Sequence, residues 1–250
     1  MDNELIKLWK AEEKNVIEGW DFSRIADRWV CPEPDWDYIT IVKTYLKDTD
    51  KLLDMGTGGG EILLTIGHPY ENTTVTEAYL PNLELCRSKL APLGITVAQT
   101  YVDDKLPFED NSFDFVINRH ESFDLNEVNR VLKKGGYFIT QQVGNKNSGE
   151  IRQRLNGELF VPYSEHEVHK YANTLQQLGY QIIKTDECTY TVKFFDVGAI
   201  VFYATSCIWE VPGFTVKSHV DKLLDCQKEI EANGFVPTTG HRFIIVSQKI

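Results

Sequence analysis

Between residues 51 and 143, short strand-like runs alternate with helical stretches, and this alternation constrains the fold most strongly. The runs are rich in β-branched and aromatic residues, which favour strands, and apolar residues at helical spacing separate them. The pattern is typical of a parallel sheet whose strands are joined by right-handed helical crossovers. The predicted strands are 51–55, 73–77, 95–102, 113–118 and 137–143, and the predicted helices lie near 60–67, 81–92 and 122–132.

Further elements are expected on both sides of this region. The sequence Ser164-Glu165-His166-Glu167 has the pattern of a capping box, which predicts that a helix begins there and ends before Gly179. A Cys-Pro-Glu-Pro stretch at 31–34 breaks the N-terminal helical region. The predicted elements outside the alternating region are helices at 3–18, 36–47, 164–178, 196–208 and 218–232 and strands at 180–186 and 242–249.

Composition excludes several classes of protein. The 250 residues include 26 basic and 37 acidic ones, a net charge of −11, which disfavours a polyanionic partner such as nucleic acid. No apolar run approaches the ~18 residues that a membrane span needs, and the charged N-terminus does not resemble a signal peptide. Five cysteines without a C-x-x-C pair indicate neither a disulfide framework nor a zinc site, so we expect a cytoplasmic protein without a metal.

The first strand of the alternating region runs into the glycine-rich sequence Asp54-Met55-Gly56-Thr57-Gly58-Gly59-Gly60-Glu61. Such a loop lets the backbone turn sharply and approach a ligand closely. A dinucleotide-binding loop would have its third glycine at residue 61, where Glu61 would repel a pyrophosphate, and no G-K-[ST] follows for a nucleotide triphosphate. The loop therefore suits a zwitterionic or cationic ligand such as S-adenosylmethionine, whose sulfonium is positive.

The second strand ends in Glu77, 17 residues after Gly60. In an open α/β sheet this position faces the ligand crevice, where a carboxylate accepts hydrogen bonds from both ribose hydroxyls and repels a 2′-phosphate. NADP is therefore disfavoured. Because the group is expected at a crevice, we expect Glu77 to contribute to ligand affinity and little to fold stability; the alternative is an exposed strand-end glutamate.

Together with these signals, the sequences VDDKLPF (102–108), FDFV (113–116) and RVLKKGGYFIT (130–140) resemble the class I S-adenosylmethionine-dependent methyltransferases over roughly residues 48–143. NRHESFD, TQQVG, DVGAIVFY and IWEVPGF also resemble a bacterial branch of that family with unassigned substrates. The resemblance implies an α/β fold: a Rossmann-like, doubly wound, seven-stranded and mainly parallel sheet with an antiparallel last strand and a helical cap.

The resemblance also implies roles for individual residues. Either Asp103 or Asp104 would meet the adenine, and the exit of the fourth strand would line the methyl-transfer site. His120 is a candidate general base there, since histidine titrates nearest neutral pH; a hydrogen-bonded loop histidine is the alternative. The implied cofactor-binding residues are Asp54 at the methionine end, Gly56, Thr57, Gly58 and Gly60 beneath the cofactor, Glu77 at the ribose, Asp103 and Asp104 at the adenine, and Asn118.

We divide the chain into an N-terminal helical cap segment (1–47), a cofactor-binding core (48–192), a helical insertion (193–240) and a last core strand (241–250). The long insertion before the last strand, Phe194 to Val236, is predicted to be a lid over the acceptor, with a structural pad or dimer contact as the alternative. The aromatic residues of the N-terminal segment either close over the cofactor or pack on the sheet; they are Trp20, Phe22, Trp29, Trp36 and Tyr38.

The predicted function is transfer of a methyl group to a small-molecule acceptor by a monomer or homodimer that does not span a membrane. The fourth strand lacks the [ND]-P-P-[YF] ending of methyltransferases that act on planar amino groups, and nucleic acid is an unlikely partner. A ribosomal- or transfer-RNA base methyltransferase and a non-catalytic cofactor-binding relative are the alternatives. A basic groove for RNA would have to come from Arg24, Arg28, Arg119, Arg152 and Arg154.

Overall fold

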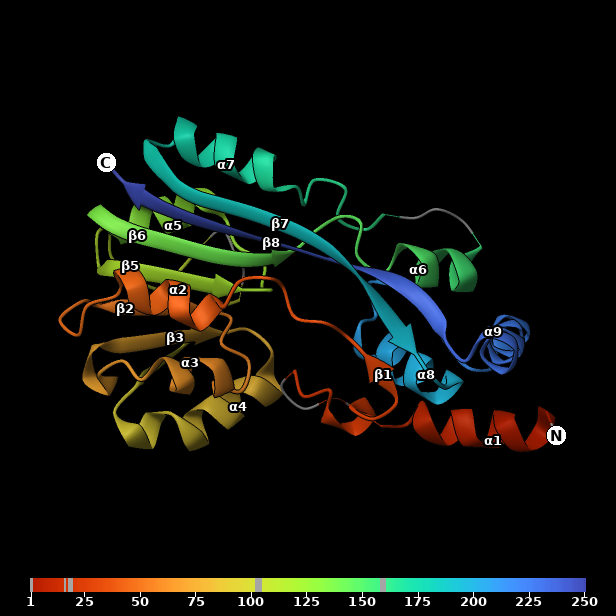
Figure 1. Ribbon diagram of the computed structural model, residues 1–250. Helices are drawn as coiled ribbons and strands as arrows, with labels where there is room; N and C mark the ends of the chain where they lie inside the picture. Colours follow the sequence, from red (N-terminus) through yellow and green to blue (C-terminus); the bar gives the residue numbers. More distant parts are fainter. Residues whose placement is uncertain (1, 16, 18–19, 102–104, 158–160) are drawn as a thin grey trace.

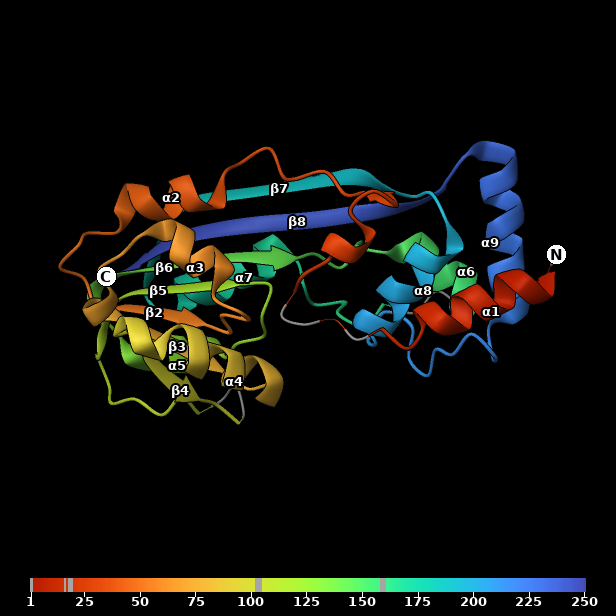
Figure 2. The same cartoon turned by 90° about the horizontal axis from the view of Figure 1, so that it is seen from below.

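The computed structural model describes residues 2–15, 17, 20–101, 105–157 and 161–250 (Figures 1 and 2). Among these residues, a mixed sheet carries helices on both faces, and its longest strands run on into a second group of helices. In chain order the elements are α1 (Asp2–Glu12), η1 (Ser23–Ile25), β1 (Trp29–Val30), α2 (Tyr38–Tyr45), β2 (Leu52–Met55), α3 (Glu61–Ile66), η2 (Tyr70–Asn72), β3 (Thr73–Glu77), α4 (Leu80–Lys89), η3 (Ala91–Leu93), β4 (Thr96–Gln99), β5 (Phe113–Arg119), α5 (Leu125–Val131), β6 (Leu132–Val143), α6 (Gly149–Asn156), α7 (Val168–Gln177), β7 (Tyr180–Phe194), α8 (Val197–Ser206), α9 (Val220–Asn233) and β8 (Val236–Lys249).

The strand order is β1-β7-β8-β6-β5-β2-β3-β4. Strands β2 to β6 pair in parallel, and β8 lies antiparallel between β6 and β7, which confirms the mainly parallel sheet with an antiparallel last strand. The sheet has eight strands, however, and the predicted number of seven is wrong. The additional strand is β1, whose two residues pair with the far end of β7 and are too few to show any periodicity in the sequence.

Alternate residues of the central strands face opposite sides of the sheet, because successive side chains of a strand point in opposite directions. On β2, Leu52 packs toward α2, α3 and α4, whereas Leu53 packs toward α5 and α7. On β8, Ile244 and Ile245 divide in the same way. Both faces are therefore covered by helices, as a doubly wound sheet requires.

Strands β7 and β8 are longer than predicted and project from the sheet as a two-stranded ribbon (Figure 1). Residues 242–248 of β8 pair with β6, whereas residues 236–241 pair with β7 alone. The projecting part packs with α1, α6, α8 and α9 around a separate apolar core, and we call this group the cap. The N-terminal helix and the insertion thus share one core although they lie about 200 residues apart in sequence.

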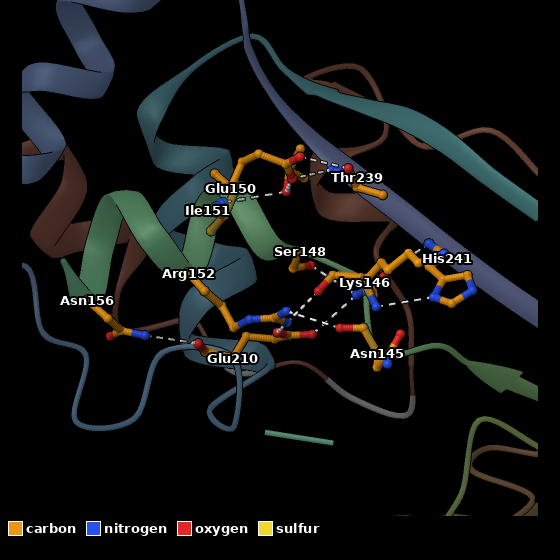
Figure 3. Close-up of polar contacts among 12 residues, drawn as sticks. Asn145, Lys146, Ser148, Glu150, Ile151, Arg152, Asn156, Glu210, Thr239 and His241 are labelled. Atoms are coloured by element: carbon orange, nitrogen blue, oxygen red, sulfur yellow. Dashed lines mark hydrogen bonds and ion pairs between the residues drawn. The ribbon is translucent and has the colours of Figure 1, made fainter. Parts of the chain in front are cut away.

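A buried polar cluster joins the elements of the cap to the ribbon (Figure 3). The Arg152 guanidinium of α6 donates to Glu210 Oε2 at 2.5 Å, and both side chains are at most 5% exposed. Glu150 accepts from the Thr239 backbone N–H at 2.7 Å, and Lys146 N–H donates to His241 Nδ1 at 3.1 Å. Because an unpaired buried charge is costly, the Arg152–Glu210 pair holds α6 against the segment that follows α8.

The region after β6 corrects two further expectations. Helix α6 was not predicted, and α7 begins at Val168, four residues after Ser164, with Glu167 as its N-cap residue and no side-chain capping bond. Residues 162–165 form a turn, so the sequence pattern at Ser164 is not a capping box. In the described parts of the chain, no helix has the length and apolar character to cross a bilayer, and no three potential metal ligands cluster.

Candidate active site

The carboxyl ends of the parallel strands converge beside the point where the strand order reverses, between β2 and β5. Asp54 and Met55 end β2, Glu77 ends β3, and Asn118 lies on β5 directly opposite Met55. Ligands of open α/β sheets bind in the crevice outside such a reversal. The structure thus brings the residues of the glycine-rich loop, Asp54 and Glu77 together at one place.

The glycine-rich loop leaves β2 in a conformation that side chains disfavour. Gly56 has a φ of 67° and Gly58 a φ of 63°, both in the left-handed region. A Cβ on Gly56 would collide with the side chain of Glu121, and a Cβ on Gly58 would lie 3.4 Å from Cδ1 of Trp20. The loop therefore needs glycine for its backbone conformation at both positions and for close approach at Gly56.

Glu77 fastens this loop to the end of β3. Its Oε2 accepts from the Gly58 backbone N–H at 3.0 Å, and its Oε1 accepts from the N–H groups of Ala78 and Tyr79, both at 2.9 Å. The residue is only 4% exposed. Glu77 is thus a buried acceptor for three backbone donors, and from this geometry we expect it to contribute to fold stability as well as to ligand affinity.

Asp54 is buried beneath the same loop, and its carboxyl has a pKa raised to about 7. Burial away from water is the main cause; the nearby Thr57 hydroxyl and Arg119 act in the opposite direction, and the negative charge of Glu77 raises the pKa further. The Thr57 hydroxyl itself reaches no partner at full hydrogen-bond geometry among the described residues. A cation arriving at this place would favour the ionised form of Asp54.

The side chain of Asn118 is engaged within the sheet. Its Oδ1 accepts from the Gln142 amide and from the Thr140 hydroxyl, the latter at 3.3 Å, and the residue is fully buried. Gln142 also donates to the Glu121 carbonyl oxygen at 3.2 Å. Asn118 therefore ties β5 to β6, and its side-chain oxygen is already used by protein partners, whereas Gln142 makes the bond to the loop that carries Glu121.

His120 lies at the exit of β5 in the left-handed region, with a φ of 65°. The indole N–H of Trp36 can only donate, and it binds Gln141 Oε1 at 2.7 Å. The amide nitrogen of Gln141 is therefore the group that faces His120 Nε2, at 3.1 Å, and it donates that hydrogen bond. Burial, with Arg242 and Arg119 nearby, holds the pKa of His120 well below its ordinary value. The imidazole is thus neutral, accepts at Nε2 and carries its proton on Nδ1.

A cavity of about 480 Å³ opens between the segment that precedes α2 and the ends of β5 and β6. Arg119 and Gln141 line it from the strands, and Trp36 and Tyr38 line it from the N-terminal segment, where Trp36 bonds Gln141. A second, much smaller cavity lies at Gly56, Thr76 and Glu121. The sequence singled out Trp36 among the N-terminal aromatic residues but did not point to Gln141 or to their contact, which joins segments about 100 residues apart. Asp103 and Asp104 lie outside the described residues.

Comparison with known proteins identifies this arrangement. A family model described as "Methyltransferase domain" matches residues 53–140, which contain the glycine-rich loop, Glu77 and the exit of β5. Residues 53–140 thus match a methyltransferase domain, and this match with the curated relatives supports a place in the class I S-adenosylmethionine-dependent methyltransferase family. The family's cofactor is S-adenosylmethionine, as the resemblance implied.

Two curated relatives are similar to this chain over part of its length. The ubiquinone/menaquinone biosynthesis C-methyltransferase UbiE of Neisseria meningitidis is 32% identical over 116 residues, covering 42% of this chain and 47% of that protein. The "Probable phthiotriol/phenolphthiotriol dimycocerosates methyltransferase 2" of Mycobacterium ulcerans is 32% identical over 119 residues, covering 42% and 46%. The chain therefore spans about half the length of the curated relatives it matches.

Solved structures show the same fold over a larger part of the methyltransferase. The YcgJ protein of Bacillus subtilis has a TM-score of 0.56 at 18% identity, covering 84% of this chain and 96% of that one. A functionally unknown protein from Deinococcus radiodurans has a TM-score of 0.58 at 13% identity, covering 92% and 99%. At these identities the likeness establishes the architecture alone.

The residues present fit the family's cofactor. The buried carboxyls of Asp54 and Glu77 supply negative charge for a ligand whose sulfonium and ammonium groups are positive. Gly56 and Gly58 leave their backbone without side chains, and the buried Thr57 hydroxyl retains a free donor. Asp54, Thr57 and the loop would hold the amino-acid end, and Glu77 would meet the ribose with the lone pairs that its backbone donors leave free.

The raised pKa of Asp54 predicts a pH dependence of stability. Because the folded-state pKa of about 7 exceeds the ordinary 3.8, the folded protein holds a proton that the unfolded chain releases between these values. The free energy of unfolding should therefore fall, by an amount on the order of a few kcal/mol, as the pH rises from about 4 to about 8. Urea unfolding of the wild type and of Asp54→Asn across this range isolates the effect. A wild-type-minus-variant difference that does not change with pH would show that Asp54 titrates normally.

Proposed function

We propose that this methyltransferase transfers the methyl group of S-adenosylmethionine to a small organic acceptor. The strongest support is that the glycine-rich loop, Asp54 and Glu77 meet at the strand ends. Trp20, an aromatic residue of the N-terminal segment, lies directly beside the loop. When bound, the cofactor supplies an electrophilic methyl group on a positively charged sulfur. The protein's own contribution is then to bind, orient and exclude water.

The insertion is proposed to act as the acceptor lid. Trp20 lies against Gly58, and Trp209, from the insertion, packs edge-on against Trp20 with ring centroids 5.6 Å apart. Trp20 is still 47% exposed, so this pair borders open space rather than a closed core. An acceptor that enters beside the glycine-rich loop would therefore meet Trp20 and Trp209, whose rings supply apolar surface that displaces water.

The charges favour a small acceptor over RNA. Arg24 and Arg28 pair with Glu12, Arg152 pairs with Glu210, and Arg154 pairs with a further carboxylate, Glu229. Four of the five arginines that would have to line a basic groove are therefore neutralised by a neighbour within 3.2 Å, and Arg119 alone cannot form such a groove. The five cysteines are unpaired, which supports the proposal that the protein works in a reducing compartment such as the cytoplasm.

Methyl-labelled S-adenosylmethionine tests the proposed function. The protein is incubated with the labelled cofactor and, in parallel, with a small-molecule extract and with total RNA. We expect label in an extractable small molecule and none above background in RNA. Label in RNA would favour a base methyltransferase. A protein that binds the cofactor but labels neither fraction would favour the non-catalytic alternative. His120, which is neutral and already hydrogen-bonded, is compatible with that alternative.

The lid predicts a separation between turnover and cofactor binding. Trp209→Ala removes the ring that packs on Trp20, so acceptor turnover should fall by about tenfold, equivalent to ~1.4 kcal/mol of barrier. The dissociation constant of S-adenosylhomocysteine should change less than about twofold, because it is Trp20, and not Trp209, that would meet a Cβ on Gly58. Ile208→Ala is the control, since Ile208 is 65% exposed next to the same position. Tyr203→Phe is a milder probe than alanine, because Tyr203 is buried and its hydroxyl bonds Ser148 at 2.6 Å. Equal loss in the Trp209 and Ile208 variants would contradict the lid.

A further inference from the structure

Arg119 is distinguished from the other arginines by its lack of a partner. Each of the other seven donates at least one hydrogen bond to another residue, most of them to a carboxylate. Among the described residues, the Arg119 guanidinium makes neither a hydrogen bond nor an ion pair. A guanidinium is always charged and has five N–H donors, so an unpaired one beside a cavity indicates a ligand that would satisfy it.

The surroundings of Arg119 define the charge of that ligand. Arg119 ends β5, opposite Gln141 of β6, and both line the cavity of about 480 Å³. The outer wall of this cavity carries the exposed carboxylates Glu33, Asp35 and Asp37. One cationic group on the strand side and several anionic groups on the outer side favour a ligand that has an anionic end and a cationic part.

Asp54 lies on the neighbouring strand, close enough for the Arg119 charge to act on its carboxyl. The backbone register places Ile117 of β5 opposite Asp54, two residues before Arg119. The pair thus offers a carboxylate and a guanidinium at adjacent strand ends. An α-amino acid group, with its ammonium and carboxylate on one carbon, matches this arrangement.

We propose that Arg119 binds a carboxylate in this cavity as the anion-recognising residue of the site. The proposal rests on the proposed function, because the amino-acid end of the cofactor satisfies Asp54 and Arg119 together. A carboxylate on the acceptor is the other source of the same chemistry. A guanidinium binds a carboxylate through two parallel N–H···O bonds, which an ammonium does not reproduce.

Calorimetry with two nucleosides tests the proposal. S-adenosylhomocysteine has the amino-acid end, whereas 5′-methylthioadenosine shares its adenosine and thioether but lacks that end. Arg119→Gln should lower the affinity for S-adenosylhomocysteine by about 10- to 100-fold and leave the affinity for 5′-methylthioadenosine within about twofold of the wild type. Arg119→Lys should recover part of the loss. Arg87→Gln is the matched control, because Arg87 is an exposed arginine on α4 whose partner is Glu84.

A further arm distinguishes the acceptor as the source. The wild type saturated with S-adenosylhomocysteine is titrated with benzoate and with neutral benzamide. If Arg119→Gln leaves S-adenosylhomocysteine unchanged but removes a benzoate-specific heat, the carboxylate belongs to the acceptor and the proposal stands. If neither ligand responds to Arg119→Gln while the thermal midpoint is unchanged, the proposal is overturned. A wild type that binds neither nucleoside would instead overturn the proposed function, and this inference with it.

Discussion

Replacing Gly58 with valine is expected to weaken binding of S-adenosylhomocysteine by at least about 100-fold. Gly58 has a φ of 63°, which a β-branched residue adopts only with strain, and its N–H is held by Glu77. The added methyl groups would extend beyond a Cβ that already lies 3.4 Å from Trp20. The loop must therefore change its path at the place where the ligand approaches the backbone. Isothermal titration of the variant and the wild type measures the loss.

Gly234→Val is the matched control for this variant. Gly234 also has a left-handed φ, of 84°, at the end of α9, and a Cβ there would meet nothing within 4 Å. It should lower the free energy of unfolding through the same kind of backbone strain and leave ligand affinity unchanged. A folded Gly58→Val protein with wild-type affinity would show that the loop does not approach the ligand.

Glu77→Gln is expected to lower the affinity for S-adenosylhomocysteine by about 10- to 100-fold and to lower the free energy of unfolding by about 1–3 kcal/mol. A glutamine side chain keeps one acceptor oxygen, and its NH₂ group then faces backbone donors that the carboxylate had accepted. The same change also removes negative charge from the proposed cationic-ligand site. Titration calorimetry and urea unfolding measure the two effects separately.

Glu71→Gln provides the comparison, since Glu71 is an exposed residue in η2, the short helix that precedes β3. That variant should match the wild type in both measurements. Loss of stability in Glu77→Gln without loss of affinity would mean that this carboxylate only fastens the glycine-rich loop and does not contact the ligand.

The central strands were predictable because they are buried on both faces. Strand 73–77 was predicted at its observed bounds, and β2 begins one residue later than expected, since a doubly covered strand consists mainly of apolar and β-branched residues, here interrupted only by the site carboxylates Asp54 and Glu77. The glycine-rich loop was readable for a similar reason: its left-handed backbone at Gly56 and Gly58 leaves few alternatives to glycine. Both features are determined by the preferences of residues that are close in sequence.

The features that were missed depend on contacts between distant segments. Strand β1 exists only because the end of β7 extends far enough to pair with Trp29 and Val30. The Trp36–Gln141–His120 chain joins the N-terminal segment to two strand ends, so no sequence spacing reveals it. The pattern at Ser164 was misleading because residues 162–165 form a turn, and α7 begins only at Val168.

We expect the protein to bind S-adenosylmethionine in the crevice formed by Asp54, the glycine-rich loop and Glu77. Isothermal titration of the wild-type protein with S-adenosylhomocysteine, and separately with NAD, tests it most directly. We expect saturable binding of S-adenosylhomocysteine and no measurable heat from NAD, because Glu61 places a carboxylate where a pyrophosphate would rest. Tight binding of NAD with no heat from S-adenosylhomocysteine would contradict it.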